Sequence, residues 1–299
     1  MKKLPLVFSG CLLGLAGAGN LVLDTLPVLS QVFSLTGFIL WIYFFIFHLL
    51  NWEETKQELT KPPLLSGMAT FPMAGMILST YIFRVFPAFP LVSQGIWWFS
   101  FLLDLALIAG FTIKFACPGK RVNATPSWTV LYVGIAVAAL TYPLVGIIEI
   151  AYATLSFGFL LTFYLYPLIY SDLKKHPLPP ALLGQEGIYC APFSLLLASL
   201  VRVGGASLPT WILIVMILSS QSFFFFVLTR LPNILKQGFQ PAFSALTFPT
   251  IITATSLKMA QGILKLPFLD YLVLAETIIC LTILLFVLGT YLIWLRKKV

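Results

Sequence analysis

Residues 243–256 read Phe243-Ser-Ala-Leu-Thr-Phe248-Pro249-Thr-Ile-Ile-Thr-Ala-Thr-Ser256 and lie inside an apolar run, 239–264, that is long enough to cross a bilayer. Proline removes one helical hydrogen bond and clashes with the preceding turn, so we expect a helix break or kink at Pro249. In lipid, a break persists only where other helices, side-chain hydroxyls or a water-filled cavity satisfy the freed carbonyl groups. The four threonines of this run can satisfy part of them.

Two interpretations of Phe248 follow from this pattern. A large apolar ring held at a helix break in the middle of the membrane is suited to blocking a pore. The same ring also fits the core of an ordinary kinked helix, and this stretch alone does not separate the two. Helical spacing places Ser244, Ile251 and Thr255 on nearly the same face as Phe248.

The composition defines the class of protein. The chain has 299 residues, of which 60% are hydrophobic and only 9% are charged, and its mean hydropathy is +0.99. Soluble domains contain about a quarter charged residues, so the sequence predicts an all-α integral membrane protein with residues 1–299 in a single transmembrane domain. The net charge of +8 does not indicate a nucleic-acid partner, because basic residues collect in the cytoplasmic loops of membrane proteins.

Ten apolar runs can be drawn, and each is long enough for one transmembrane helix. They cover residues 5–23, 28–50, 64–86, 90–114, 126–147, 148–170, 182–202, 206–229, 239–264 and 268–295. We interpret the first run as a retained span rather than a cleaved signal peptide, because it continues apolar beyond the possible cleavage site at Ala16-Gly17-Ala18.

The basic residues support the count of ten. With ten spans, one side receives 14 of the 18 basic residues, namely Lys2, Lys3, Lys56, Lys61, Lys114, Lys120, Arg121, Lys174, Lys175, Arg230, Lys236, Arg296, Lys297 and Lys298. The other side receives Arg84, Arg202 and Lys265, and Lys258 falls inside a span. The positive-inside rule then predicts a multi-pass protein of the cell membrane with both termini in the cytoplasm.

The odd-numbered runs carry prolines and small residues, whereas the even-numbered runs are bulky and aromatic. This alternation predicts five helical hairpins, with the odd helices lining a central pore and the even helices facing lipid. The candidate pore-lining or helix-break residues are Pro5, Gly10, Gly14, Phe71, Pro72, Pro126, Gly134, Pro192, Pro249 and Thr255, with Phe248 as the candidate gate.

The chain resembles the tellurite-resistance and dicarboxylate transporter family, whose relatives include the slow-type anion channels of plants. The resemblance is sharpest at Leu4-Pro5-Leu-Val-Phe-Ser-Gly10, Thr125-Pro126-Ser-Trp, Cys190-Ala-Pro192-Phe and Thr247-Phe248-Pro249. It implies ten helices arranged as five hairpins around a pore, assembly as a homotrimer, and a phenylalanine, here Phe248, that plugs the pore. The substrates of the family range over dicarboxylates, sulfite, tellurite and small inorganic anions.

Three ionisable residues lie within spans: Asp104, Lys258 and Glu276. Because buried charges are usually paired, we expect an ion pair between Lys258 and Glu276, which lie at similar distances from the turn near Leu266. The alternative for Lys258 is a pore-lining role. Asp104 lies on a bulky even-numbered helix, where we expect it to bond a hydroxyl or a cation of another helix.

The sequence thus favours an anion channel or channel-like transporter gated by Phe248. The alternatives are a secondary carrier for C4-dicarboxylates such as malate, coupled to protons through Asp104 or Glu276, and an exporter of tellurite or sulfite. An integral-membrane enzyme is disfavoured because the loops carry no cluster of acids or histidines. With two histidines and four scattered cysteines, we expect no metal site and no cofactor.

Overall fold

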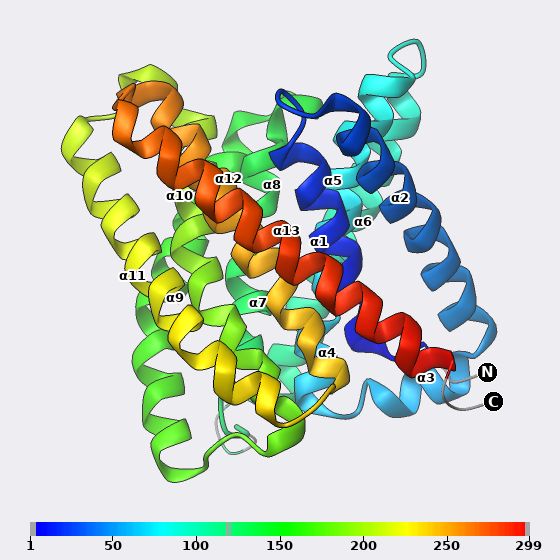
Figure 1. Cartoon of the computed structure of the whole chain (residues 1–299). Helices are drawn as coiled ribbons and strands as arrows, with labels where there is room; N and C mark the ends of the chain where they lie inside the picture. Colours follow the sequence, from blue (N-terminus) through cyan, green and yellow to red (C-terminus); the bar gives the residue numbers. More distant parts are fainter. Residues whose placement is uncertain (1–3, 118, 120, 297–299) are drawn as a thin grey trace.

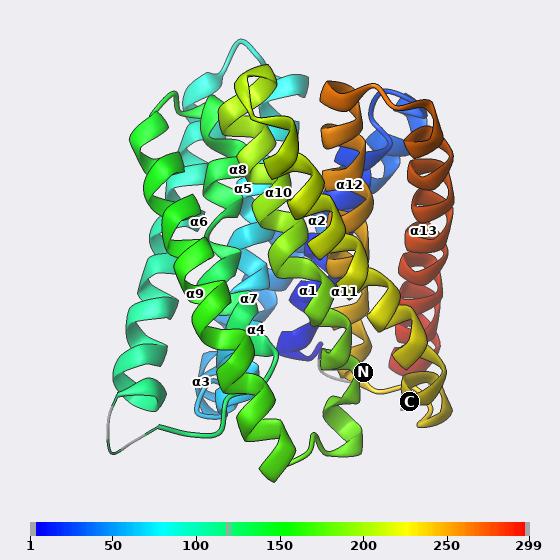
Figure 2. The same cartoon turned by 90° about the vertical axis from the view of Figure 1, so that its left-hand side faces the viewer.

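The computed structural model describes residues 4–117, 119 and 121–296, and this part of the chain is helical throughout, without a strand (Figure 1). Helix occupies each of the ten predicted runs. The helices form an inner layer and an outer layer around it (Figure 2).

The inner elements correspond to the odd-numbered runs, and each of them consists of two or more helical pieces. They are η1 (Leu6–Phe8) with α1 (Ser9–Leu21), α4 (Pro62–Gly67) with α5 (Thr70–Val85), α7 (Ser127–Gly134) with α8 (Val137–Thr141) and η3 (Tyr142–Leu144), η4 (Pro180–Cys190) with α10 (Ala191–Gly204), and η6 (Pro241–Leu246) with α12 (Thr247–Leu264). The predicted prolines lie where these helices begin, since a missing N–H costs least in the first turn.

The outer helices correspond to the even-numbered runs. They are α2 (Pro27–Leu50), α6 (Pro90–Phe111), α9 (Ile148–Lys175), α11 (Thr210–Lys236) and α13 (Pro267–Arg296), with α3 (Trp52–Glu58) and the π-helical turn η2 (Thr112–Ala116) in the connections. Between 28% and 39% of each outer membrane segment is buried, against 78% of 62–85 and 61% of 180–207 in the inner layer. The outer helices therefore present their bulky side chains to lipid, as the alternation in the sequence predicts.

Contacts between elements close the inner layer on itself. The helix α1 contacts α5, α5 contacts α7 and α8, both of these contact α10, α10 contacts α12, and α12 returns to α1. Each inner element also packs against the outer helix that follows it in the chain. The chain is thus folded as a series of helical hairpins.

Within the described residues, seven helices are long and apolar enough to cross a membrane, and the pair 127–134 and 137–144, bent by 45°, makes an eighth if it counts as one span. The segment Leu6–Leu21 is apolar but shorter. The helix α12 has 18 residues and is more polar, because its threonines, Lys258 and Gln261 lower its hydropathy. A multi-pass membrane protein is confirmed, and the count of ten spans stays a prediction.

The start of α1 and the end of α13 lie at the same end of the bundle (Figures 1 and 2), where the rings of Phe8 and Tyr291 are 5.1 Å apart. The connections that contain α3 and η2, and the ends of α9 and α11, lie at this end too. Most of the described basic residues therefore gather at one end. Five others in the predicted cytoplasmic set, Lys2, Lys3, Lys120, Lys297 and Lys298, lie outside the described residues.

Candidate functional site

Two cavities lie inside the ring of inner elements. The lower cavity, at the end where α1 begins, is lined by the first turns of the inner helices, for example Gly10 of α1 and Ser127 of α7. The upper cavity is lined by later turns of the same layer, for example Asn20 and Thr80. The two cavities are therefore stacked along the axis of the bundle.

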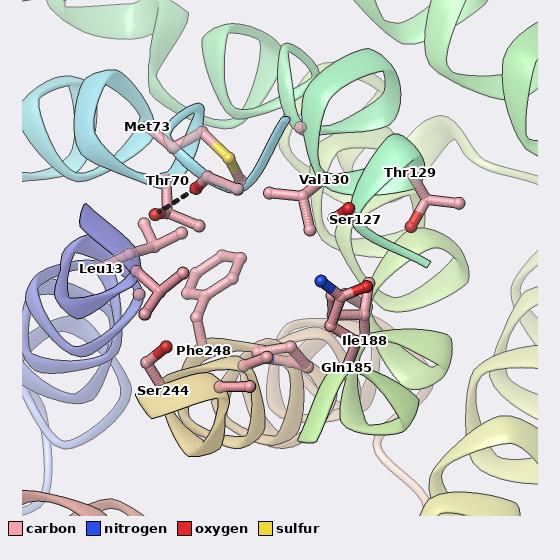
Figure 3. A pocket seen from close by; sticks show the side chains of 18 of the residues that line it. Leu13, Thr70, Met73, Ser127, Thr129, Val130, Gln185, Ile188, Ser244 and Phe248 are labelled. Atoms are coloured by element: carbon pink, nitrogen blue, oxygen red, sulfur yellow. Dashed lines mark hydrogen bonds between the residues drawn. The ribbon is translucent and has the colours of Figure 1, made fainter. Parts of the chain in front are cut away.

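Phe248 lines both cavities and lies between them. Its side chain is only 3% exposed, and Figure 3 shows its ring projecting from α12 into the lower cavity toward Leu13 and Met73. The upper cavity is the larger one, with a volume of about 620 Å³ against about 70 Å³ for the lower cavity. Phe248 thus lies between a large cavity and a small one.

The break that places this ring lies between η6 and α12, where a 3-10 helix becomes an α-helix at Thr247. The threonine hydroxyls satisfy carbonyl groups around the break, as predicted. Thr247 Oγ1 donates to the carbonyl oxygens of Gly10 (2.8 Å) and Ser244 (2.7 Å), and Thr250 Oγ1 donates to that of Leu246 (2.9 Å). The bond to Gly10 holds the start of α12 against α1, and the other two join α12 to η6.

The upper cavity is positively charged. Among the described residues, Arg84, Arg202 and Lys258 line it together with one acid, Asp24. Lys258 Nζ lies 3.1 Å from Asp24 Oδ2 and donates to the carbonyl oxygen of Leu21 (2.9 Å). Three cations facing one carboxylate attract anions from the solution on this side.

The lower cavity has no charged residue among its described lining residues. Its polar groups are hydroxyls, backbone groups and the side-chain amide of Gln185 (Figure 3). The inner helices begin here and run toward the upper end, so the positive ends of their dipoles face this cavity. An anion here meets neutral donors and positive helix ends.

Six of the eleven sequence-predicted pore residues, the candidate gate included, line a cavity. Gly10, Gly134, Pro192 and Pro249 line the lower cavity, Thr255 lines the upper one, and Phe248 lines both. The rest do not border either cavity; they are Pro5, Gly14, Phe71, Pro72 and Pro126.

Two of the latter residues have packing roles. Phe71 is 1% exposed and stacks on the ring of Trp41, with centroids 4.9 Å apart and the planes at 6°. At Gly14, a Cβ atom would lie 2.7 Å from Thr247 Oγ1, so glycine allows α1 and α12 to cross closely. Proline spacing predicted which helices are inner ones, but it does not give the direction in which each side chain points.

The predicted ion pair between Lys258 and Glu276 is wrong. Lys258 faces the upper cavity, where it pairs with Asp24. Glu276 is 1% exposed, and neither of its carboxyl oxygens has a hydrogen-bond partner. The two residues lie at similar depths on neighbouring helices but on faces that point in different directions.

Asp104 also departs from expectation. It is fully buried, and its carboxyl oxygens lack the predicted hydroxyl or cation partner. Neither Asp104 nor Glu276 lines a cavity. In the described part of the chain, no group of three or more His, Cys, Asp or Glu side chains is placed to hold a metal ion.

Sequence reasoning missed Asn20, Asp24 and Gln185 as lining residues, and it assigned Arg84 and Arg202 only to a side of the membrane. One signal could have identified the two arginines. They end α5 and α10 on the side that holds few basic residues, and a ring of inner helices brings such ends together. No comparable signal marks Gln185.

The fold and the site define a multi-pass helical membrane protein with two stacked cavities separated by one phenylalanine. The chain belongs to the voltage-dependent anion channel family, whose sequence profile matches residues 3–292. The predicted resemblance to this group of channels and transporters is thereby confirmed over nearly the whole chain. No curated protein matches the sequence.

Proposed function

We propose that this protein conducts small anions through a pore formed by its two cavities, and that Phe248 is the gate. The observation that carries the proposal is the position of Phe248. It lines both cavities, and no other described residue lines both. An apolar ring across a narrow passage excludes ions by its bulk and by keeping water out.

The sign of the permeating ion follows from the charges. The upper cavity holds three cations and one acid, and the lower cavity has no acid among its described lining residues. A cation pathway would require acidic side chains or rings of carbonyl groups along its length. The cations of the upper cavity and the neutral donors of the lower cavity favour an anion along the whole path.

The remaining features of the proposal concern topology and assembly. Residues 1–299 form one membrane domain of ten spans in five hairpins around the pore, with both termini in the cytoplasm of a cell-membrane protein. The even number of spans is supported by the start of α1 and the end of α13 lying together. The homotrimer is supported by the family resemblance alone, with one pore in each protomer.

The test is anion flux in liposomes that contain the parent protein or Phe248→Ala. The variant is expected to pass chloride at least tenfold faster than the parent while its elution profile stays that of folded protein. Equal flux from the two proteins would show that Phe248 is not the gate.

A secondary carrier for C4-dicarboxylates remains the alternative, because the three cations of the upper cavity suit a doubly charged anion there. Proton coupling through Asp104 or Glu276 has less support, since neither residue borders the path. Uptake of labelled malate, measured in the same vesicles as chloride conductance, separates a carrier from a channel. Labelled sulfite and tellurite test the export alternative.

A further inference from the structure

Among the described residues that line the lower cavity, Gln185 alone carries a side-chain amide. The residue is 5% exposed, and its Oε1 atom has no hydrogen-bond partner. No described residue bonds its amide nitrogen either. Figure 3 shows the amide pointing into the cavity from η4, on the side facing the ring of Phe248. The buried atom without a partner is the oxygen, which cannot bond an anion. The amide nitrogen lies on the side toward Phe248 (Figure 3), so its N–H groups are available to a ligand in the cavity.

The backbone around Gln185 is held tightly in place. A Cβ atom at Gly184 would lie 2.4 Å from the carbonyl oxygen of Ala242, and one at Gly187 would lie 2.9 Å from that of Ala245. The two glycines allow η4 to pack directly on the backbone of η6. Gln185 therefore projects from a rigid pair of 3-10 helices that also leads into α12 and Phe248.

The side-chain donors left in the cavity are the amide and the hydroxyls of Ser127 and Ser244, because the threonine hydroxyls are engaged. The hydroxyls of Thr70 and Thr129 already donate to the carbonyl oxygens of Gly67 (2.9 Å) and Pro126 (2.8 Å). The next residue in the chain, Glu186, is bound on both carboxyl oxygens by Arg230, at 2.9 Å each. Its charge is thus compensated and is directed toward α11 rather than into the cavity.

We propose that the amide of Gln185 binds the permeating anion directly below the gate, and that this site takes a small monovalent anion. The inference rests on the proposed function and specifies the ligand of the same pathway. An amide N–H donates to one anion, and positive helix ends add a partial charge. Neutral donors do not compensate the second charge of a dicarboxylate, because no cation of the described chain lines this cavity.

The experiment compares Gln185→Leu and Gln185→Glu with a matched control, Gln94→Leu, each in the parent and in the Phe248→Ala background. Gln94 lies on α6, donates to the carbonyl oxygen of Leu144 and borders neither cavity. Two quantities are measured: the chloride concentration that gives half-maximal flux in liposomes, and the melting temperature in sodium chloride against sodium gluconate of equal ionic strength.

In the Phe248→Ala background, Gln185→Leu should raise the half-saturating chloride concentration about tenfold, the loss expected for one hydrogen bond to a charged group. It should also abolish the chloride-dependent rise in melting temperature, while the melting temperature in gluconate stays unchanged or increases. Gln185→Glu should give a flux that falls as the pH rises from 5 to 9, because the introduced carboxylate repels the anion. Gln94→Leu should leave the half-saturating concentration, the chloride-dependent rise and the pH response of flux unchanged. Its melting temperature should fall equally in both salts, because the hydrogen bond to Leu144 is lost.

Unchanged half-saturation and unchanged chloride stabilisation in Gln185→Leu would overturn the site, while flux through Phe248→Ala alone would keep the proposed function. Chloride stabilisation lost in Gln185→Leu, combined with no flux through Phe248→Ala, would overturn the proposed function and keep the site. Malate dianion that passes Phe248→Ala as fast as chloride would overturn the restriction to monovalent anions.

Discussion

The ring of Phe248 packs on the bare backbone of Gly17. A Cβ atom at Gly17 would lie 3.2 Å from Cδ2 and 3.4 Å from Cε2 of the ring, and 3.1 Å from Cγ2 of Ile251. These separations are shorter than ordinary van der Waals contacts between carbon atoms. The ring of Phe248, which belongs to α12, is therefore also held in position by its contact with α1.

The variant Gly17→Ala is expected to displace the ring of Phe248 and to raise the chloride leak of the parent protein. Overpacking of this kind costs about 1–3 kcal/mol of unfolding free energy. In the Phe248→Ala background the added methyl group should change flux little, because the ring is gone. Gly95→Ala is the control, since a Cβ at Gly95 meets nothing within 4 Å. Identical leak in the two alanine variants would contradict the contact.

The variant Lys258→Met should lower chloride flux through Phe248→Ala several-fold at low salt and less at high salt, because screening weakens the field of the upper cavity. The unfolding free energy should change by only about 0.2–1 kcal/mol, since the side chains of Lys258 and Asp24 are 27% and 76% exposed. Lys265→Met, outside the cavity lining, is the control. A flux that does not depend on Lys258 would exclude it from the conduction path.

Substitutions of Lys258 and Glu276 should act independently. The unfolding free energies of Lys258→Met and Glu276→Gln are expected to add within about 0.5 kcal/mol in the double variant, as for residues without shared partners. Glu276→Gln alone should be neutral or stabilising, because the carboxyl group is buried without a hydrogen-bond partner. Thermal unfolding in detergent measures the free energies of the single and double variants. A coupling energy above about 1 kcal/mol would show that Lys258 and Glu276 do interact.

The inner helices could be predicted from the sequence because helices that face lipid differ in amino-acid composition from helices that pack inside the bundle. Small residues such as Gly10 and Gly134 and the first-turn prolines occur where helices pack closely, and bulky residues occur where they face lipid. Phe248 could be singled out because its helix break is visible in the sequence at Pro249.

The direction of each side chain could not be predicted from such patterns. The spacing of residues in the sequence predicts how deep each one lies along its helix. Whether Lys258 points toward Asp24 depends on how α12 is rotated against α1. Gln185 escaped notice because its cavity is assembled from five separate segments of the chain. No local pattern contains that information.

A reporter that is active only outside the cytoplasm should give no signal when fused after Val299, because an even number of spans and the basic residues place both ends in the cytoplasm. The same reporter inserted between α5 and α6, at Pro87, should give a strong signal. The reverse pattern would show that both termini lie outside the cytoplasm, and signal from both fusions would mean an even number of spans between them.

The last prediction separates a gate from a core residue by comparing Phe248→Ala with Phe71→Ala. Phe71 is enclosed by Trp41, Phe44 and Phe45, so its truncation leaves a closed cavity and should cost about 3–5 kcal/mol. Phe248 already borders two cavities, so truncation joins existing space and should cost about 1–2 kcal/mol, below the range for an enclosed phenylalanine.

Melting curves and chloride flux, measured on the same preparations, give four results to compare. Phe71→Ala should be less stable and closed, and Phe248→Ala should be nearly as stable as the parent and open. A Phe248→Ala protein that melts as early as Phe71→Ala and passes no chloride would make Phe248 a packing residue. In that case the two cavities would be separated by something other than its ring, because removing the ring would not have joined them.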